Sequence, residues 1–337
     1  MRPFLHVTRL ATIVLLAAVL SLWAALALWY RLPAPEWGKY LAIAACGVFT
    51  SIVIYNIIKG PQLKSFATYA LVFSGMLVWW SSIEPPATGN WAPDVARQTT
   101  GVIEGDILTL TNVREFEWQS KHEAIENWTT RTYDLSKLET VDVFLSYWSG
   151  PQMAHFILSF GFEDSEYLAW TIEVRREIGS GYSPIADLFK EHTIVVLATT
   201  ERDVVGLRTN FRKEDVHLFR LRTQPERARN LLEEYVRDAN ELSVEPQWYN
   251  SVMTNCTTVV VKMLAAVGDG IPFDWRLIAN GFLPEMAYER KTINTDYSIS
   301  QLRELGSVTP KAQEFGLDPG FSGAIRVGVP KPYTKPE

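Results

Sequence analysis

Apolar runs in the first 83 residues constrain the fold of this chain more than any other feature. Residues 10–30 contain no charged side chain, and residues 40–58 form a second uncharged run. Residues 66–83 form a third, shorter run. A bilayer-spanning helix needs roughly 20 predominantly apolar residues. The sequence therefore predicts a membrane anchor over residues 1–83 with three transmembrane helices, and it leaves open whether residues 66–83 cross completely.

A cleavable signal peptide is the alternative interpretation of the first run. The apolar part of a signal peptide is only about 7–15 residues long and ends in small residues. This run instead ends in Trp29, Tyr30 and Arg31. The sequence thus favours a helix that stays in the membrane.

Basic residues near the apolar runs predict the orientation of the anchor. Arg2 and Arg9 precede the first run, and Lys59 and Lys64 lie between the second and third runs. Lys and Arg concentrate on the cytoplasmic side of membrane proteins. We therefore expect a cytoplasmic N-terminus, which, with three spans, places everything after about residue 84 outside the cytoplasm.

The part of the chain after residue 83 is acidic. The first 83 residues hold six Lys or Arg and one Asp or Glu out of 32 and 38 in the chain, so the remainder carries 26 basic and 37 acidic residues. Nucleic-acid binding requires a basic surface, and we expect no nucleic acid among the partners. Membrane lipids or lipoproteins stay compatible with this charge. The sequence does not define an oligomeric state.

The remainder divides into a linker over residues 84–100, an outer domain over residues 101–330 and a disordered tail over residues 331–337. Strands precede helices in the outer domain, an order that favours an α+β fold with an antiparallel sheet. Strands are predicted at residues 105–118, 131–135, 141–148, 154–162, 167–175, 193–199 and 215–221. Helices are predicted at residues 224–242, 255–267 and around 283–290.

Cys256 is one of two cysteines in the chain and stands at the start of a predicted helix. The apolar positions of residues 255–267 recur with helical spacing up to Gly268, and Thr254 is the predicted N-cap. The first turn of a helix favours a thiolate and offers N–H groups to an oxyanion. Cys256 is therefore a candidate nucleophile, with a small buried apolar side chain as the alternative role.

A base for this thiol is found in a predicted hairpin. Two strands meet across the three-residue turn 163–165, so residue 162 pairs with residue 166 and His155 falls opposite Glu173. Their side chains then share one face of the sheet, where the carboxylate can orient the imidazole. A surface His–Glu pair of no consequence is the alternative.

Other polar residues are candidates for binding substrate. Asn255 precedes the cysteine, Ser159 follows His155 on the same predicted strand face, and Arg114 lies in a strand with other polar groups. No spacing typical of a zinc site, a P-loop, a dinucleotide fold or a serine-hydrolase elbow occurs. We therefore predict no metal and no cofactor.

Several segments together resemble the Lnb N-terminal periplasmic domain family. They are SYWSGPQMAHFILSFGFED, TIEVRREIGSGYSPI, ERDVVGLRTNFRKEDVHLFRL, WYNSVMTNCTT, PFDWRLIANGF and DPGFSGAIRVGVP, spread from Asp94 to Pro330. The family is similar to papain-like, NlpC-type thiol enzymes in circularly permuted form and to the lecithin:retinol acyltransferase group. This resemblance implies a permuted papain-like fold in the bacterial periplasm, with Cys256 as nucleophile, His155 as base and Glu173 as orienting acid.

The resemblance also implies a reaction, which is acyl transfer within a bacterial lipoprotein. One departure is that the membrane helices here precede the domain, whereas the family's namesake carries them after it. We therefore expect a multi-pass inner-membrane thiol acyltransferase or hydrolase acting on a lipid or lipoprotein acyl group. The alternatives are a thiol amidase or peptidase acting on peptidoglycan or an envelope peptide, and a non-catalytic envelope binding module.

Overall fold

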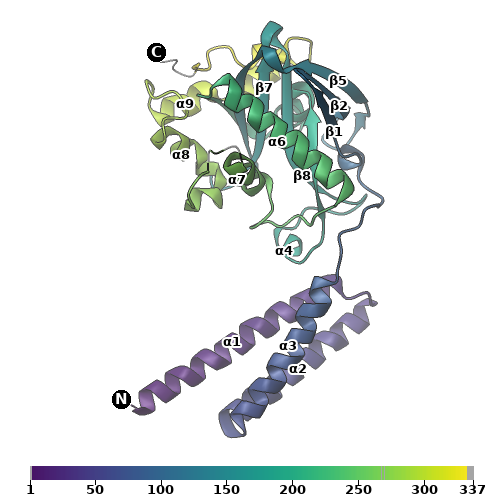
Figure 1. Ribbon diagram of the computed structural model, residues 1–337, viewed down its shortest axis with the longest axis vertical. Helices are drawn as coiled ribbons and strands as arrows, with labels where there is room; N and C mark the ends of the chain where they lie inside the picture. The colour runs from purple at the N-terminus through teal and green to yellow at the C-terminus, as the bar shows by residue number, and fades with distance from the viewer. Residues whose placement is uncertain (1, 267, 269, 332–337) are drawn as a thin grey trace. The chain divides into compact units, whose positions relative to one another are not determined.

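The computed structural model describes residues 2–266, 268 and 270–331, which divide into two compact units (Figure 1). The first unit contains the chain up to Pro86 together with Ser183–Glu191, and the second contains the rest. Apart from Lys331, the predicted tail lies outside the described residues, as does Val267, which we assigned to the helix after Cys256.

The first unit is built from three helices where the apolar runs predicted them: α1 (Arg2–Arg31), α2 (Glu36–Lys59) and α3 (Gln62–Ser81). Two segments, Leu10–Arg31 and Glu36–Lys59, are long and apolar enough to cross a membrane. The helix α3 is not one of these two. The third crossing therefore stays a prediction.

A buried hydrogen-bonded group joins the three helices. The Tyr69 hydroxyl of α3 donates to the carbonyl of Ala17 at 3.0 Å and lies 2.9 Å from the Ser21 hydroxyl, both of α1. Thr50 of α2 donates to the same Ser21 hydroxyl at 2.7 Å. Because apolar side chains cover most of the outer surface of these helices, such internal polar contacts are what specify how they associate.

A short segment from the middle of the chain packs with these helices. Within Ser183–Glu191, the Phe189 ring stacks on Tyr30 at 5.4 Å between centroids and meets Trp80 edge-on at 6.2 Å. The Lys190 ammonium donates to the carbonyl of Trp80 at 2.6 Å. The helical unit is therefore not continuous in the sequence.

The second unit contains a sheet with the strand order β1-β2-β9-β8-β7-β6-β10, and β5 pairs with β2. The expected antiparallel sheet is in fact mixed, because β2 and β9 pair in parallel where Arg114 lies beside Thr199. The strand β9 follows the β6-β7-β8 meander in the chain and lies between β8 and β2. It runs antiparallel to β8 and parallel to β2. The strands are β1 (Thr100–Glu104), β2 (Ile107–Arg114), β5 (Trp128–Asp134), β6 (Leu138–Tyr147), β7 (Ala154–Phe162), β8 (Tyr167–Arg175), β9 (Thr193–Thr199) and β10 (Asp215–Leu221), with a separate pair β3 (Glu117–Trp118) and β4 (Ala124–Ile125).

Residues of the predicted linker enter this unit before β1. Val95 and Thr99 are almost fully buried. The Gln98 side chain donates to the carbonyl of Val196 at 2.8 Å. The segment preceding β1 is thus part of the packed outer unit.

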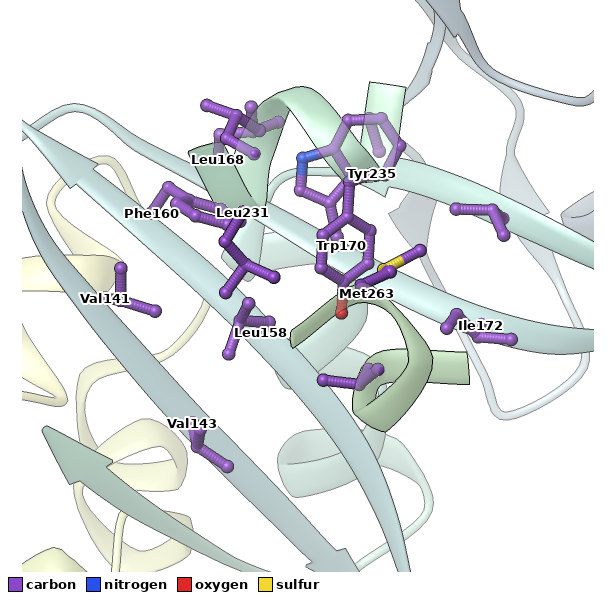
Figure 2. Close-up of a cluster of buried hydrophobic side chains, with 14 of the residues drawn as sticks. Val141, Val143, Leu158, Phe160, Leu168, Trp170, Ile172, Leu231, Tyr235 and Met263 are labelled. Carbon is purple, nitrogen blue, oxygen red and sulfur yellow. The ribbon is translucent and has the colours of Figure 1, made fainter. Parts of the chain in front are cut away.

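Helices cover both faces of the sheet. On one face α6 and α7 enclose the larger core, in which Trp170 packs beside Tyr235 and Met263, with Leu158 and Phe160 in the same cluster (Figure 2). On the other face α5 and the C-terminal helices enclose a second, smaller core. The helices of this unit are α5 (Glu201–Gly206), α6 (Pro225–Val244), α7 (Cys256–Ala266), α8 (Leu283–Glu289), α9 (Ile299–Gly306), α10 (Thr309–Phe315) and α11 (Phe321–Ala324), whereas α4 (Pro184–Asp187) belongs to the first unit.

Truncation of the core tests this arrangement. Leu158 is 1% exposed, so Leu158→Ala should lower the free energy of unfolding by about 2–5 kcal/mol, since it leaves a cavity. Val102 of β1 is 62% exposed, and Val102→Ala should change the same quantity by less than about 0.5 kcal/mol. Thermal unfolding of the full chain, followed by tryptophan fluorescence, measures both. Equal effects would contradict the proposed core.

Candidate active site

Cys256 is the first residue of α7, and the preceding asparagine caps this helix. The Asn255 carboxamide oxygen accepts from the N–H groups of Thr257 at 2.9 Å and Thr258 at 3.0 Å. The Thr258 hydroxyl in return accepts from the Asn255 N–H at 2.9 Å. The predicted N-cap, Thr254, is thus wrong by one residue, because its backbone pairs with the preceding loop instead.

This cap changes the expected oxyanion site. The N–H groups of Thr257 and Thr258 are already engaged by Asn255 and are not available to a substrate. The Val259 N–H donates to the Asn255 backbone carbonyl at 3.1 Å. Of the four N–H groups in the first turn of α7, as the structure describes it, the Cys256 N–H is therefore the one that does not donate to Asn255. An oxyanion site built on this helix therefore rests on the Cys256 amide rather than on several amides of the turn.

The β7–β8 hairpin has the predicted register. Ile157 pairs with Thr171, and the same register continued would place His155 opposite Glu173. The pairing ends at Ile157 and Thr171, so the strands separate at the end where His155 and Glu173 lie. The imidazole Nε2 and the carboxylate Oε1 nevertheless lie 3.2 Å apart. The expected His–Glu pair is confirmed.

The separation of β7 and β8 is also where the thiol meets the imidazole. The helix α7 lies on the face of the larger core, whereas alternation along β7 places His155 with Ile157 on the opposite face. At the end of the pairing, the Cys256 thiol hydrogen-bonds with the His155 ring, and the backbone N–H of Phe156 donates to the sulfur. Groups from both faces thus converge on one sulfur atom.

A threonine connects the imidazole to the carboxylate. The Thr171 hydroxyl donates to Glu173 Oε1 at 2.9 Å and lies 2.6 Å from His155 Nε2. Because its proton goes to the carboxylate, the hydroxyl accepts from Nε2–H. Since Nε2 is engaged with Thr171 and Glu173, Nδ1 is the ring nitrogen that remains to hydrogen-bond with the Cys256 sulfur. Sequence analysis did not single out Thr171, although its place two residues before Glu173 on the same strand face is a usable signal.

Arg208 is a second residue that sequence analysis missed. It lies in a π-helical turn, Leu207–Phe211, directly after α5, and such turns are frequent at functional sites. Its guanidinium donates to Glu173 Oε1 at 2.9 Å and to the carbonyl of Val204 at 3.0 Å. The side chain is almost fully buried. No sequence spacing relates Arg208 to Glu173, since they meet only through the packing of α5 on the sheet.

Asn280 is a third such residue and approaches the sulfur from a loop. Its amide nitrogen lies 4.0 Å from the Cys256 sulfur and donates to the Ala154 carbonyl at 2.7 Å and the Thr257 hydroxyl at 2.9 Å. Its amide oxygen accepts from the Ala154 N–H at 2.8 Å. Asn280 therefore ties the first turn of α7 to the start of β7 and fixes the distance between cysteine and histidine.

The electrostatics of the site favour a charged thiolate–imidazolium pair. Burial raises the pKa of Cys256, but the bond to His155 and the Phe156 N–H outweigh it, so the thiol pKa lies below its ordinary value. Burial lowers the pKa of His155, but the Glu173 charge together with the hydrogen bonds to Cys256 and Glu173 outweighs burial, so the net shift of the His155 pKa is upward. Burial raises the pKa of Glu173, whereas His155 and Arg208 hold it well below its usual range.

The three predicted substrate contacts have different surroundings. Asn255 lines the cavity that contains Cys256, but its carboxamide is occupied with capping. Arg114 lines the same cavity, with its guanidinium bound at 3.0 Å to both carboxylate oxygens of Asp203. Ser159 is fully buried and donates to Glu201 at 2.5 Å. All three have structural partners, and their roles toward a substrate stay predictions.

The cavity around the site has a volume of about 1010 Å³ and belongs entirely to the outer unit. His155, Glu173, Arg208 and Cys256 line one part of it, together with Asn280. Both charged and aromatic side chains form the remaining walls. Within residues 2–266, 268 and 270–331, no group of three or more His, Cys, Asp or Glu side chains is arranged to hold a metal ion.

Residues 124–281 match the model of the Lnb N-terminal periplasmic domain family. No curated protein and no solved structure matches the chain. The matched range contains His155, Glu173 and Cys256, and it supports the family resemblance. Together with the two apolar N-terminal helices, it indicates a periplasmic domain with a membrane anchor.

The depressed thiol pKa is testable by alkylation with iodoacetamide, followed by peptide mass spectrometry at Cys256. A group with a lowered pKa stays ionised to lower pH, so the rate should reach half its plateau below about pH 8.5, the ordinary thiol value. His155→Gln should move the midpoint upward, because burial raises the pKa of Cys256 and the substitution removes the imidazolium charge that lowers it. A wild-type midpoint at or above the ordinary value would refute the thiolate–imidazolium pair.

The bridging hydroxyl gives a second prediction. Thr171→Val keeps the shape of the side chain but removes a hydrogen bond near charged groups, which contributes about 1.5–3 kcal/mol. The alkylation rate of Cys256 at neutral pH should therefore fall by about tenfold or more. Thr199→Val on β9 is the matched control, because the Thr199 hydroxyl donates to a backbone carbonyl. Equal rates in the two variants would assign Thr171 a structural role alone.

Proposed function

We propose that this protein is a membrane-anchored thiol acyltransferase or hydrolase that acts on a lipid or lipoprotein acyl group at the periplasmic face. The observation that carries the proposal is the convergence of Cys256 with His155, whose ring is held by Thr171 and Glu173. A cysteine that only fills space in the core needs none of these partners. Nucleophile, base and orienting carboxylate are the parts that covalent acyl transfer requires.

The proposed reaction has two steps. The Cys256 thiolate attacks an ester carbonyl, a C–S bond forms, the C–O bond breaks, and the protonated imidazole of His155 gives its proton to the departing alkoxide. An amine or water then attacks the thioester while His155 takes up its proton, which releases the amide or acid and restores the thiolate. Acid–base catalysis of this kind typically contributes about 10²–10⁴-fold.

The family match and the membrane anchor support the choice of substrate. The order His155, Glu173, Cys256 along the chain is the order of a permuted papain-like enzyme, which the resemblance implies. The proposal includes a circularly permuted papain-like fold for the outer unit. It also includes an anchor, residues 1–83, that crosses the inner membrane three times. An anchored site works on substrates that are themselves confined to the bilayer, which favours lipids and lipoproteins.

A specific observation favours a second candidate, an amidase or peptidase with the same site. The cavity at Cys256 is lined by several basic and acidic side chains, among them Arg176, Arg212 and Glu214. Charged walls of both signs suit a peptide better than a hydrocarbon chain. Peptide cleavage uses the same two steps, with an amine instead of an alcohol leaving first.

Incubation of the purified full chain with a membrane lipid extract tests the first candidate. Intact-mass and peptide mass spectrometry should find an acyl adduct on Cys256, and Cys256→Ala should remove it. Hydroxylamine, which cleaves thioesters at neutral pH, should release the adduct from the wild type.

The amidase candidate predicts a different outcome of the same measurement. Peptidoglycan or envelope peptides would be cleaved in a Cys256-dependent way, and the lipid extract would leave no adduct. Unchanged lipid and peptide products in both the wild type and Cys256→Ala would refute both enzyme candidates and favour a binding module.

A further inference from the structure

A second, larger cavity lies in the outer unit beside the site. Its volume is about 1820 Å³, above the roughly 300–1,000 Å³ typical of small-molecule sites. Strands β6, β7 and β10 line this cavity together with α6, α7, α8, the loop between α7 and α8, and the segment around α11. Apolar side chains dominate the interior of this cavity: Val143, Leu145, Phe156, Val260, Leu264 and Met286.

This cavity adjoins the catalytic cavity. Thr257 and Leu277 line both of them. Thr257 directly follows Cys256 in α7, and Phe156, which lines the larger cavity, directly follows His155 in β7. The apolar space therefore begins within one residue of both reacting side chains.

The opposite end of the larger cavity is basic. His155 pairs with Ser146 near one end of β6, whereas Arg222 follows Leu221 of β10, which pairs with Val141 toward the other end of β6. The Arg222 N–H donates to the Thr292 carbonyl at 2.7 Å, so the segment before Thr292 also lies at that end. The cavity is lined there by exposed cations. These are Arg222, Arg227, Arg290 and Lys291. In a domain with an excess of acidic residues, this group of cations is a local reversal of charge. Hydrated charges mark the place where the apolar interior ends.

We propose that the larger cavity, named here the acyl cavity, holds the hydrocarbon chain of the acyl donor, with its carbonyl at Cys256 and the chain running along α7 toward the basic end. The proposal rests on the acyl transfer proposed above and specifies its donor as a long-chain lipid ester. The apolar lining matches a hydrocarbon, and the two shared residues place the start of the chain at the sulfur. The charged cavity at Cys256 is then left for the acceptor.

Photo-crosslinking tests occupancy without catalysis. A palmitic acid analogue with a diazirine near its methyl end is added to the full-length Cys256→Ala protein, and peptide mass spectrometry locates the adducts. We expect adducts on α7 and on residues 283–293. Val261 lines the acyl cavity, so Val261→Trp should reduce these adducts about tenfold. Adducts confined to α1–α3 and unaffected by this substitution would overturn the proposal.

Selectivity for chain length tests the same cavity during turnover. Val261→Trp should lower the ratio of kcat/KM for the p-nitrophenyl ester of palmitate to that of butyrate by about tenfold or more, because the bulky ring shortens the apolar space. Ile271→Trp, from the loop after α7, should act in the same direction. Ala265→Trp is the matched control, since Ala265 is an exposed position of α7 outside the lining, and it should leave the ratio unchanged. A ratio that neither Val261→Trp nor Ile271→Trp lowers, or that Ala265→Trp lowers equally, would overturn the proposal.

The two experiments separate this proposal from the proposed function. If crosslinking responds to Val261→Trp but no acyl adduct forms on Cys256, the acyl cavity stands and acyl transfer fails. If an adduct forms on Cys256 but neither crosslinking nor the chain-length ratio responds to Val261→Trp, acyl transfer stands and the acyl cavity fails. Crosslinking displaced by an envelope peptide rather than by palmitate would assign the cavity to a peptide and overturn the proposal.

Discussion

The pairing of β7 with β8 is the constraint on which the site depends. The three-residue turn Glu163–Ser165 sets its register, with Asp164 at a φ of 59° and Ser165 at a φ of 60°. Side chains alternate between the two faces of a strand, so a shift of one residue would move His155 and Glu173 to opposite faces. The turn at the far end of the hairpin therefore determines which residues of β7 and β8 lie opposite each other at the site.

The early end of that pairing is as important as its register. Had β7 and β8 stayed paired past Ile157, the N–H of Phe156 would not be free to donate to sulfur. Burial alone favours a neutral thiol, a neutral imidazole and a neutral carboxyl group. The site keeps three charges because each has a partner of opposite sign or a donor within reach, and Arg208 completes the set on the carboxylate side. Unpaired, any of these charges would be costly to bury.

Much of this outer unit follows from sequence patterns, and the exceptions have physical reasons. The bounds of β7, β8, β9 and β10 agree with the prediction because alternating apolar residues and turn residues are local signals. The pair His155 and Glu173 could be predicted because a hairpin register is also local. Arg208 and Asn280 could not, because they reach the site from the π-helical turn after α5 and from a loop, whose positions depend on long-range packing. The parallel pairing of β2 with β9 is likewise absent from any local pattern.

The inclusion of Ser183–Glu191 in the helical unit limits how this molecule can be divided. The outer unit cannot be excised as one continuous piece, because this segment interrupts it between β8 and β9. A fragment beginning at Ala87 would retain Phe189 but lose Tyr30 and Trp80, the rings that cover it. The apolar face of Phe189 would then meet water just before β9, the strand that pairs with the Glu173 strand β8, and such an exposed apolar loop favours aggregation.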